Sequence, residues 1–276
     1  MSEATETRSL VVIDEITGEV VSAEYTLRHR NQDEAYRKVK EAERSVDGRQ
    51  WIAGYHDPIR DIIKDLSLIE AGAIVKLLPY LQLKSNGKLI VDGKPLKQSD
   101  IQRIFKRGKD ATRAILDRLK DIGVITVEKN GRSNVYFISA EFHTMGNVKE
   151  GERFTKLYKV KTRQITEDLD LNEAGLLYKI LPFFHYEEYY LCENPNEPDP
   201  EIIRHMDREL LAEAIGHDRD TVTTSVTKLV RKGAILVTRS GKTTRYLVHP
   251  DVMYRQKSET EWTQSVRKLF EQHNRK

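Results

Sequence analysis

The chain contains the same stretch of sequence twice, and this duplication limits its fold more than any other feature. Residues 51–81 align with residues 154–184 without a gap, and after a connection that is seven residues longer in the second copy the match resumes. The identical pairs include Tyr55/Tyr158, Gly72/Gly175, Pro79/Pro182, Asp110/Asp220, Leu119/Leu229, Gly123/Gly233 and Tyr136/Tyr246. A repeat of about a hundred residues is too long for solenoid or propeller units, so it indicates two copies of a whole domain.

Length and composition agree with two domains and narrow the class of protein. The 276 residues are 32% charged and 38% hydrophobic, and no apolar run approaches the roughly 18 residues of a membrane span. We therefore expect a cytoplasmic protein with no membrane partner. Cys192 is the only cysteine, which excludes an internal disulfide. The net charge of +3 is too small to indicate nucleic-acid binding by itself, so the distribution of charge matters more.

Within each copy the apolar spacing predicts a helix, a short strand, a second helix, a break and a longer third helix. The predicted ranges are 68–78, 89–91, 99–105 and 110–122 in the first copy, and 171–181, 189–192, 207–215 and 220–232 in the second. Asp110 and Asp220 are expected to cap the third helices, and Gly123 and Gly233 to end them.

A two-stranded hairpin is predicted after the third helix of each copy. Alternating strands flank Asn130-Gly131 in the first copy and Ser240-Gly241 in the second, and Asn-Gly between such strands is a strong hairpin signal. The expected fold class is mainly α with small β-hairpin wings (α+β), as tandem winged helix-turn-helix domains. The predicted divisions are an N-terminal hairpin and charged helix at 1–50, winged helices at 51–146 and 154–256, and a C-terminal amphipathic helix at 257–276.

The third helix is where a helix-turn-helix protein contacts the DNA major groove, and the hairpin tips reach phosphates. Arg113 is placed to bind a guanine, whereas the second copy offers threonine hydroxyls and methyls, so the copies should read unlike half-sites or contribute unequally. The predicted contacts to double-stranded DNA are Lys109, Arg113, Asp117, Lys120, Arg132 and Asn134, and Arg219, Thr221, Thr223, Thr224, Thr227, Lys228, Lys242 and Arg245.

Two other interpretations of these surfaces stay open. Basic residues on helices commonly form a solvated face, which applies above all to Lys120, Lys228 and Arg231. Winged helices also serve as protein–protein adaptors, and the second copy fits that role better because its acidic insert at 193–201 would repel phosphate.

Motifs for catalysis are missing from the sequence. It has neither a phosphate-binding glycine loop nor the paired histidines of a nicking enzyme. His185, Cys192 and His205 lack a fourth ligand at a recognisable zinc spacing, and acidic side chains of the 187–201 loop are expected to face solvent. We predict no catalytic residue, metal site or cofactor; a metal-dependent DNA-processing enzyme is the alternative from another class.

Near the C-terminus an apolar stripe recurs at helical spacing. It consists of Trp262, Val266, Leu269 and Phe270. The stripe packs either on its own domain or against a second chain as a homodimer. A symmetric dimer should bind an inverted repeat, whereas a monomer would have to read a direct repeat by itself.

Five segments of the second copy, at 154–158, 170–181, 211–216, 221–222 and 229–235, resemble the winged-helix unit of the RepL family of plasmid replication proteins. The opening at 12–21 is similar to the N-terminal segment of that family. The resemblance covers about one copy and the N-terminus, and this chain departs from the family in carrying two units. It implies a plasmid or phage DNA-binding protein that acts as replication initiator or as transcriptional regulator.

Overall fold

The computed structural model describes residues 49–131, 133–240 and 243–274. Residues Met1–Gly48 and Arg49–Lys276 form separate units, and only the second is described. The hairpin and helix predicted for the N-terminal segment therefore lie outside the described residues. The second unit is a mixed helical and β fold with small antiparallel sheets.

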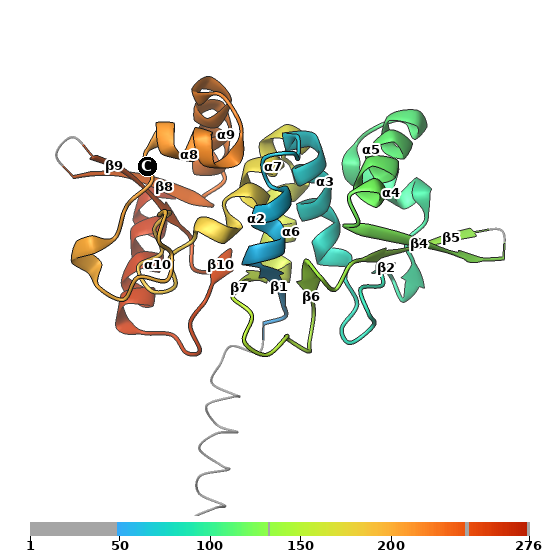
Figure 1. The fold of residues 1–276 in the computed structure, drawn as a ribbon, viewed down its shortest axis with the longest axis horizontal. Coiled ribbons are helices and arrows are strands. Elements are labelled where there is room, and N and C mark those ends of the chain that lie inside the picture. The colour runs from blue at the N-terminus through green and yellow to red at the C-terminus, as the bar shows by residue number, and fades with distance from the viewer. Residues whose placement is uncertain (1–48, 132, 241–242, 275–276) are drawn as a thin grey trace, which may run out of the picture. The chain divides into compact units, whose positions relative to one another are not determined.

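Both copies have the same order of main helices, hairpins and sheet strands, drawn in Figure 1, but among the described residues the second lacks counterparts of β2 and β3 and adds a 3₁₀ turn and a C-terminal helix. The first copy comprises β1 (Trp51–Tyr55), α2 (His56–Ile62), α3 (Leu68–Leu77), a 3₁₀ turn (Leu78–Tyr80), β2 (Ile90–Val91), β3 (Lys94–Pro95), α4 (Gln98–Phe105), α5 (Lys109–Asp121), β4 (Ile125–Asn130), β5 (Ser133–Ile138) and β6 (His143–Thr144). The second comprises β7 (Phe154–Tyr158), α6 (Lys159–Glu167), α7 (Leu171–Lys179), two 3₁₀ turns (Leu181–Phe183 and Pro200–Ile202), α8 (Arg208–Ile215), α9 (Arg219–Arg231), β8 (Ile235–Ser240), β9 (Thr243–Val248), β10 (Met253–Tyr254) and α10 (Glu261–Asn274). The predicted helices and hairpins are thus present in both copies, and β2 matches the short strand predicted at 89–91. The prediction of a strand at 189–192 is wrong, because these residues form only isolated bridges, with Phe184, Leu247 and His205.

The ends of the third helices differ in part from the prediction. α5 has Gly108 as its N-cap, and α9 has Asp218, whose carboxylate accepts a hydrogen bond from the Thr221 amide at 2.8 Å. The prediction that Asp110 and Asp220 cap these helices is wrong, because both lie in the first helical turn. The C-terminal prediction is confirmed: the glycines after both helices have positive φ, 76° at position 123 and 64° at position 233.

A four-stranded antiparallel sheet, which the sequence analysis did not predict, joins the copies in the order β10-β7-β1-β6. The β1–β7 register pairs are Trp51/Tyr158, Ile52/Leu157, Ala53/Lys156, Gly54/Thr155 and Tyr55/Phe154. Ala53 and Lys156 occupy the same position in the aligned copies, and the pairs on either side are reciprocal. Such self-complementary pairing is what a two-fold axis produces, so the copies are related as the subunits of a symmetric dimer are.

Helices α3 and α7 pack side by side above this sheet (Figure 1) and repeat the two-fold relation. A Cβ added to Gly72 would come within 1.8 Å of the carbonyl oxygen of Leu171, and a Cβ added to Gly175 within 2.2 Å of that of Leu68. Each helix therefore uses its glycine to approach the first residue of the other. The aligned copies share these glycines because a side chain at either position would separate the helices.

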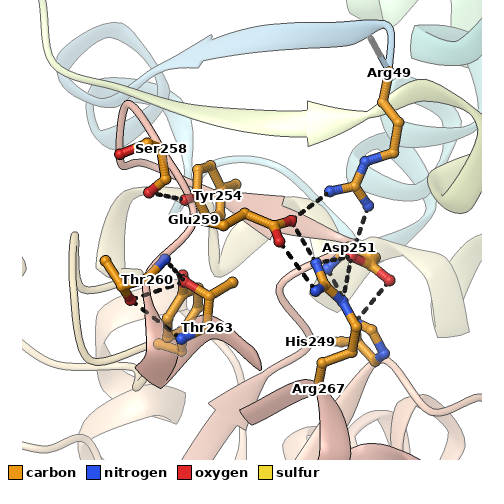
Figure 2. A network of polar contacts seen from close by, with 10 residues as sticks. Arg49, His249, Asp251, Tyr254, Ser258, Glu259, Thr260, Thr263 and Arg267 are labelled. Carbon is orange, nitrogen blue, oxygen red and sulfur yellow. Dashed lines mark hydrogen bonds and ion pairs between the residues drawn. The ribbon is translucent and has the colours of Figure 1, made fainter. Parts of the chain in front are cut away.

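The C-terminal helix α10 packs on its own chain. Val266 and Phe270 are fully buried, and the Phe270 ring lies 4.5 Å from the His249 ring. Arg267 donates hydrogen bonds to Asp251 at 2.8 Å and to Glu259 at 2.6 Å, in the network of Figure 2. Arg49 also bonds Asp251, which ties the start of the unit to its end.

Of the two alternatives for the apolar stripe, Val266 and Phe270 follow the first, because they are buried in their own chain. Trp262 and Leu269 keep 37% and 43% of their surface exposed.

Candidate nucleic-acid interface

A tight turn joins the second and third helices of each copy. α4 ends at Lys106 in a left-handed conformation with φ 53°, and α5 begins three residues later. In the second copy Gly216 takes the same conformation with φ 72°. α5 then buries Leu116 and Leu119 against the core, which leaves its other face to solvent.

The exposed face of α5 borders a hollow of about 350 Å³ between this helix and the β4–β5 hairpin. Its polar lining residues are Gln98, Lys109, Arg113, Asp117, Lys120, Lys129 and Asn134, and its apolar wall is Leu116, Val127 and Tyr136. The hollow thus brings together five of the six DNA-binding residues predicted for the first copy. The sixth, Arg132, lies outside the described residues. Lys129 also lines the hollow but was not among the residues predicted to bind DNA. Its position next to the Asn130-Gly131 turn, in a charged strand, could have indicated it.

Four cations and one carboxylate surround this hollow. Arg113 Nε lies 3.6 Å from the Asp117 carboxylate, and both side chains are largely exposed. An exposed ion pair of this kind contributes no more than about 1 kcal/mol, so an incoming phosphate or base can replace it. Asp117 thereby orients Arg113 along the helix in the free protein.

The corresponding face of α9 carries the hydroxyls of Thr223 and Thr227 where α5 has Arg113 and Asp117. Thr223 Oγ1 donates to the Arg219 carbonyl at 2.7 Å, and Thr227 Oγ1 donates to the Thr223 carbonyl at 2.8 Å. Each hydroxyl oxygen keeps lone pairs that can accept a hydrogen bond. Thr224 is exposed on the same helix. The structure thus groups Thr223, Thr224 and Thr227 as a neutral surface.

Two other predicted residues at the start of α9 are engaged locally. Thr221 Oγ1 donates to Asp218 at 2.6 Å, and this bond lowers the pKa of the Asp218 carboxyl. Arg219 forms an ion pair with Glu209 of α8 while remaining largely exposed. Both therefore stabilise the turn that precedes the third helix.

Lys228 does not belong to the outward face of α9. Its ammonium lies 2.9 Å from Glu173 of α7, and this hydrogen bond lowers the pKa of the Glu173 carboxyl. The first copy repeats the contact, with Arg118 3.5 Å from Glu70 of α3. The pair joins the third helix of each copy to its first helix. Its recurrence at aligned positions was the sequence signal that could have separated Lys228 from the predicted DNA contacts.

Arg245 also departs from its predicted place at a hairpin tip. It lies within β9 opposite Thr238, and its guanidinium lies 5.8 Å from the centre of the Tyr190 ring. Burial, reinforced by the charge of Arg245, lowers the pKa of His205 to about 4. Arg245 therefore faces the base of its own hairpin. Lys242, the other predicted residue of this hairpin, lies outside the described residues.

The described part of the chain offers little support for a metal site, a reactive cysteine or a membrane span. No three His, Cys, Asp or Glu side chains gather there as a potential metal site. Cys192 is fully buried, and burial raises the pKa of its thiol to about 12. Among the described helices, none is both long and apolar enough to cross a membrane.

Comparisons with protein-family models, with curated protein sequences and with solved structures give no match. A functional assignment therefore depends on the geometry and charge of the α5 and α9 surfaces.

Proposed function

We propose that the chain is a sequence-specific, double-stranded DNA-binding protein with two winged helix-turn-helix units. The observation that carries this proposal is the hollow between α5 and the β4–β5 hairpin, with Lys109, Arg113, Lys120 and Lys129 around it. A helix that enters the major groove beside a hairpin leaves one phosphate backbone between the two elements. Cations in that position supply the electrostatic part of DNA binding.

The relation between the copies supports an inverted site for a single chain. Figure 1 shows α5 and α9 towards opposite ends of the second unit, on the side that α3 and α7 occupy, with the two hairpins pointing away from each other. Because the β1–β7 and α3–α7 contacts are reciprocal, the third helices run in opposite senses. This favours inverted half-sites about 10–10.5 base pairs apart over the direct repeat expected for a monomer.

The half-sites should be read differently. α5 presents Arg113, which can bond guanine through two hydrogen bonds, whereas α9 presents threonines, which accept hydrogen bonds and contact thymine methyls. The first copy then supplies most of the phosphate attraction and the second adds selectivity. The inverted repeat should therefore be imperfect.

The biological role that fits such contacts is replication initiation or transcriptional regulation of a plasmid or phage in the cytoplasm. The resemblance of five second-copy segments and of the opening at 12–21 to the RepL family supports the first role. Both roles use the same DNA contacts, and gene context distinguishes them: an adjacent array of repeats indicates an origin, and a divergent promoter indicates regulation.

Site selection from a pool of random duplexes tests the proposal. The full chain should enrich an imperfect inverted repeat and bind it with an affinity that falls by roughly 10³–10⁵ between about 50 and 200 mM salt. Failure to enrich any sequence, or an affinity independent of salt, would contradict the proposal. Supercoiled DNA incubated with the protein and magnesium or manganese should stay intact; cleavage would favour the DNA-processing enzyme.

A further inference from the structure

A second cavity, of about 360 Å³, lies away from the proposed DNA contacts. It is bounded by α3 and α4 of the first copy and by α6 of the second. None of its lining residues is among those predicted to bind DNA. A volume of this size falls within the range of small-molecule sites in proteins.

Lys76 of α3 lines this cavity. This residue is only 4% exposed. Its pKa is lowered to about 8, mainly by burial and to a lesser extent by the positive charge of Lys106. Among the residues that the structure describes, none forms a hydrogen bond or ion pair with its ammonium group. Lys76 therefore lines the cavity without an acceptor of its own in the described part of the chain, and a ligand that supplies an acceptor there would be favoured.

In the second copy, the lysine at the aligned position has a hydrogen-bond acceptor within the protein. Lys179, which is aligned with Lys76, is fully buried and donates to the Ile215 carbonyl at 2.8 Å. Gly216 follows Ile215 and packs on the backbone of Lys64. A Cβ added to Gly216 would lie 3.0 Å from the Lys64 carbonyl oxygen. In the first copy Lys106 takes the place of Gly216, and its longer side chain lines the open cavity. The two copies thus differ at this position: Lys179 has a backbone acceptor, and Lys76 has none among the described residues.

The other charges of the lining also favour an anion. Arg103, Lys106 and Arg163 accompany Lys76, against the three carboxylates Asp92, Asp100 and Glu167. Asp100 and Arg103 form an ion pair with each other, which leaves the cations Lys76, Lys106 and Arg163 against the carboxylates Asp92 and Glu167.

Apolar surface for the body of a ligand is also present. Arg163 reaches across from α6, with its guanidinium 5.3 Å from the centre of the Tyr80 ring. Val91 and Ile104 complete the apolar wall.

We propose that this cavity binds a small organic molecule carrying a phosphate or carboxylate group, with Lys76 and Arg163 holding the anion and Tyr80 and Ile104 contacting its body. An occupant contacts both copies at once, because Arg163 belongs to the second and the other three residues to the first. This site goes beyond the proposed function and does not depend on DNA binding.

Labelling of the full chain with pyridoxal 5′-phosphate tests the site directly. This probe carries a phosphate and an aromatic ring, and its aldehyde condenses with the Lys76 amine, losing water to form an imine. Hydride from added borohydride reduces the imine to a stable secondary amine, which peptide mass spectrometry locates. Lys179 is the internal control, because burial lowers its pKa to about 8 as well but its ammonium is bonded to a carbonyl.

We expect label on Lys76 at least tenfold above that on Lys179. Arg163→Gln, an exposed position, should reduce the labelling of Lys76 at least fivefold, whereas Arg60→Gln at the aligned position of α2 should leave it unchanged. Inorganic phosphate and acetate are then added as competitors, each compared with chloride at equal ionic strength. The anion that reduces the labelling of Lys76 shows whether the site prefers a phosphate or a carboxylate. Equal labelling of the two lysines, protection by neither anion, or labelling indifferent to Arg163→Gln would overturn the proposal.

Discussion

Gly72 lies so close to the carbonyl oxygen of Leu171 that a Cβ at this glycine would approach the oxygen to 1.8 Å. Gly175 repeats the approach towards Leu68 at 2.2 Å. Backbone atoms cannot move aside as a flexible side chain does, so an added methyl group must separate α3 from α7. These two glycines therefore hold the copies together.

We expect Gly72→Ala and Gly175→Ala each to lower the free energy of unfolding by about 3 kcal/mol or more, as severe overpacking does. Gly108→Ser is the matched control, because a Cβ there meets no atom within 4 Å and serine is favoured at an N-cap. Urea denaturation of the three variants gives the comparison. Equal stability of all three would mean that the helices adjust without loss, contrary to the contact.

The elements of each copy could be predicted from the sequence because their signals are local. Helical spacing and the Asn130-Gly131 turn require no knowledge of distant residues. The caps were harder, because Asp218 and Asp220 are two residues apart and either fits the pattern of an N-cap. Only the backbone conformation at position 218, with ψ 160°, decides between them.

The sheet and the helix contact between copies could not be predicted in the same way, because each forms between residues about a hundred positions apart. One usable signal was the glycine repeated within a helix at positions 72 and 175. Glycine costs about 1 kcal/mol in a helix relative to alanine, so its presence in both copies indicates close packing. For the proposed DNA contacts, the alignment of Glu70 with Glu173 would have assigned Lys228 to an internal ion pair.

Arg113 is expected to contribute to base recognition, whereas Arg118 on the same helix is not. Arg113→Ala should weaken binding to the selected site by about 1–3 kcal/mol and relax the preference at one base pair. Arg118→Ala removes only the half-exposed pair with Glu70, which contributes at most about 1 kcal/mol to stability, and should preserve the affinity. Fluorescence anisotropy with the selected duplex and its single-base variants measures both. A similar loss of affinity in the two variants would contradict this assignment of α5.

Lys120 and Lys228 provide a second matched pair, for phosphate contacts. Lys120 borders the hollow beside the β4–β5 hairpin, whereas Lys228 is bonded to Glu173. Lys120→Ala should reduce the slope of log affinity against log salt by about 0.9, the value for one phosphate contact. Lys228→Ala should leave the slope unchanged and slightly lower the thermal stability. If instead the slope depends on Lys228, α9 approaches DNA with the side that faces α7.

His143 should make the stability depend on pH. Its Nδ1 lies 3.1 Å from the Ala53 carbonyl oxygen, and its Nε2 lies 3.0 Å from the Tyr178 hydroxyl of the other copy. Burial lowers the pKa of His143 to about 4, against 6.5 when exposed, although the bond to Ala53 opposes this. The neutral ring is therefore favoured in the folded state, and its contribution to stability is complete above pH 6.5 and is lost as the pH falls towards 4.

Between pH 7 and pH 5, His143→Gln should reduce the fall in unfolding free energy by about 2 kcal/mol relative to the wild type. Tyr178→Phe keeps the imidazole, so it should lower stability at every pH while retaining the wild-type fall. Urea denaturation at pH 7, 6 and 5 gives the three profiles. Parallel profiles for His143→Gln and the wild type would show that this histidine does not take up a proton on unfolding.

The C-terminal helix should stabilise its own chain rather than join two chains. Phe270→Ala removes a fully buried ring packed on His249 and should cost about 3–5 kcal/mol, whereas Leu269→Ala, which is 43% exposed, should cost less than about 1 kcal/mol. Deleting residues 259–276 should then destabilise the second unit instead of releasing a folded half-site binder, because Val266 and Phe270 leave the core and Asp251 loses its bond to Arg267.

Sedimentation of the intact chain decides whether the remaining surface of α10 joins two molecules. Trp262 and Leu269 are too few to provide the roughly 1,200 Å² or more that a stable interface buries, so we expect a monomer at tens of micromolar. A dimer that dissociates on Trp262→Ser and Leu269→Ser would instead assign these two residues to an interface. In a monomer, the reciprocal β1–β7 and α3–α7 contacts, the latter at Gly72 and Gly175, set the spacing of the two third helices. A variant that loosens those contacts should then lose affinity for the full site while keeping its affinity for the first half-site.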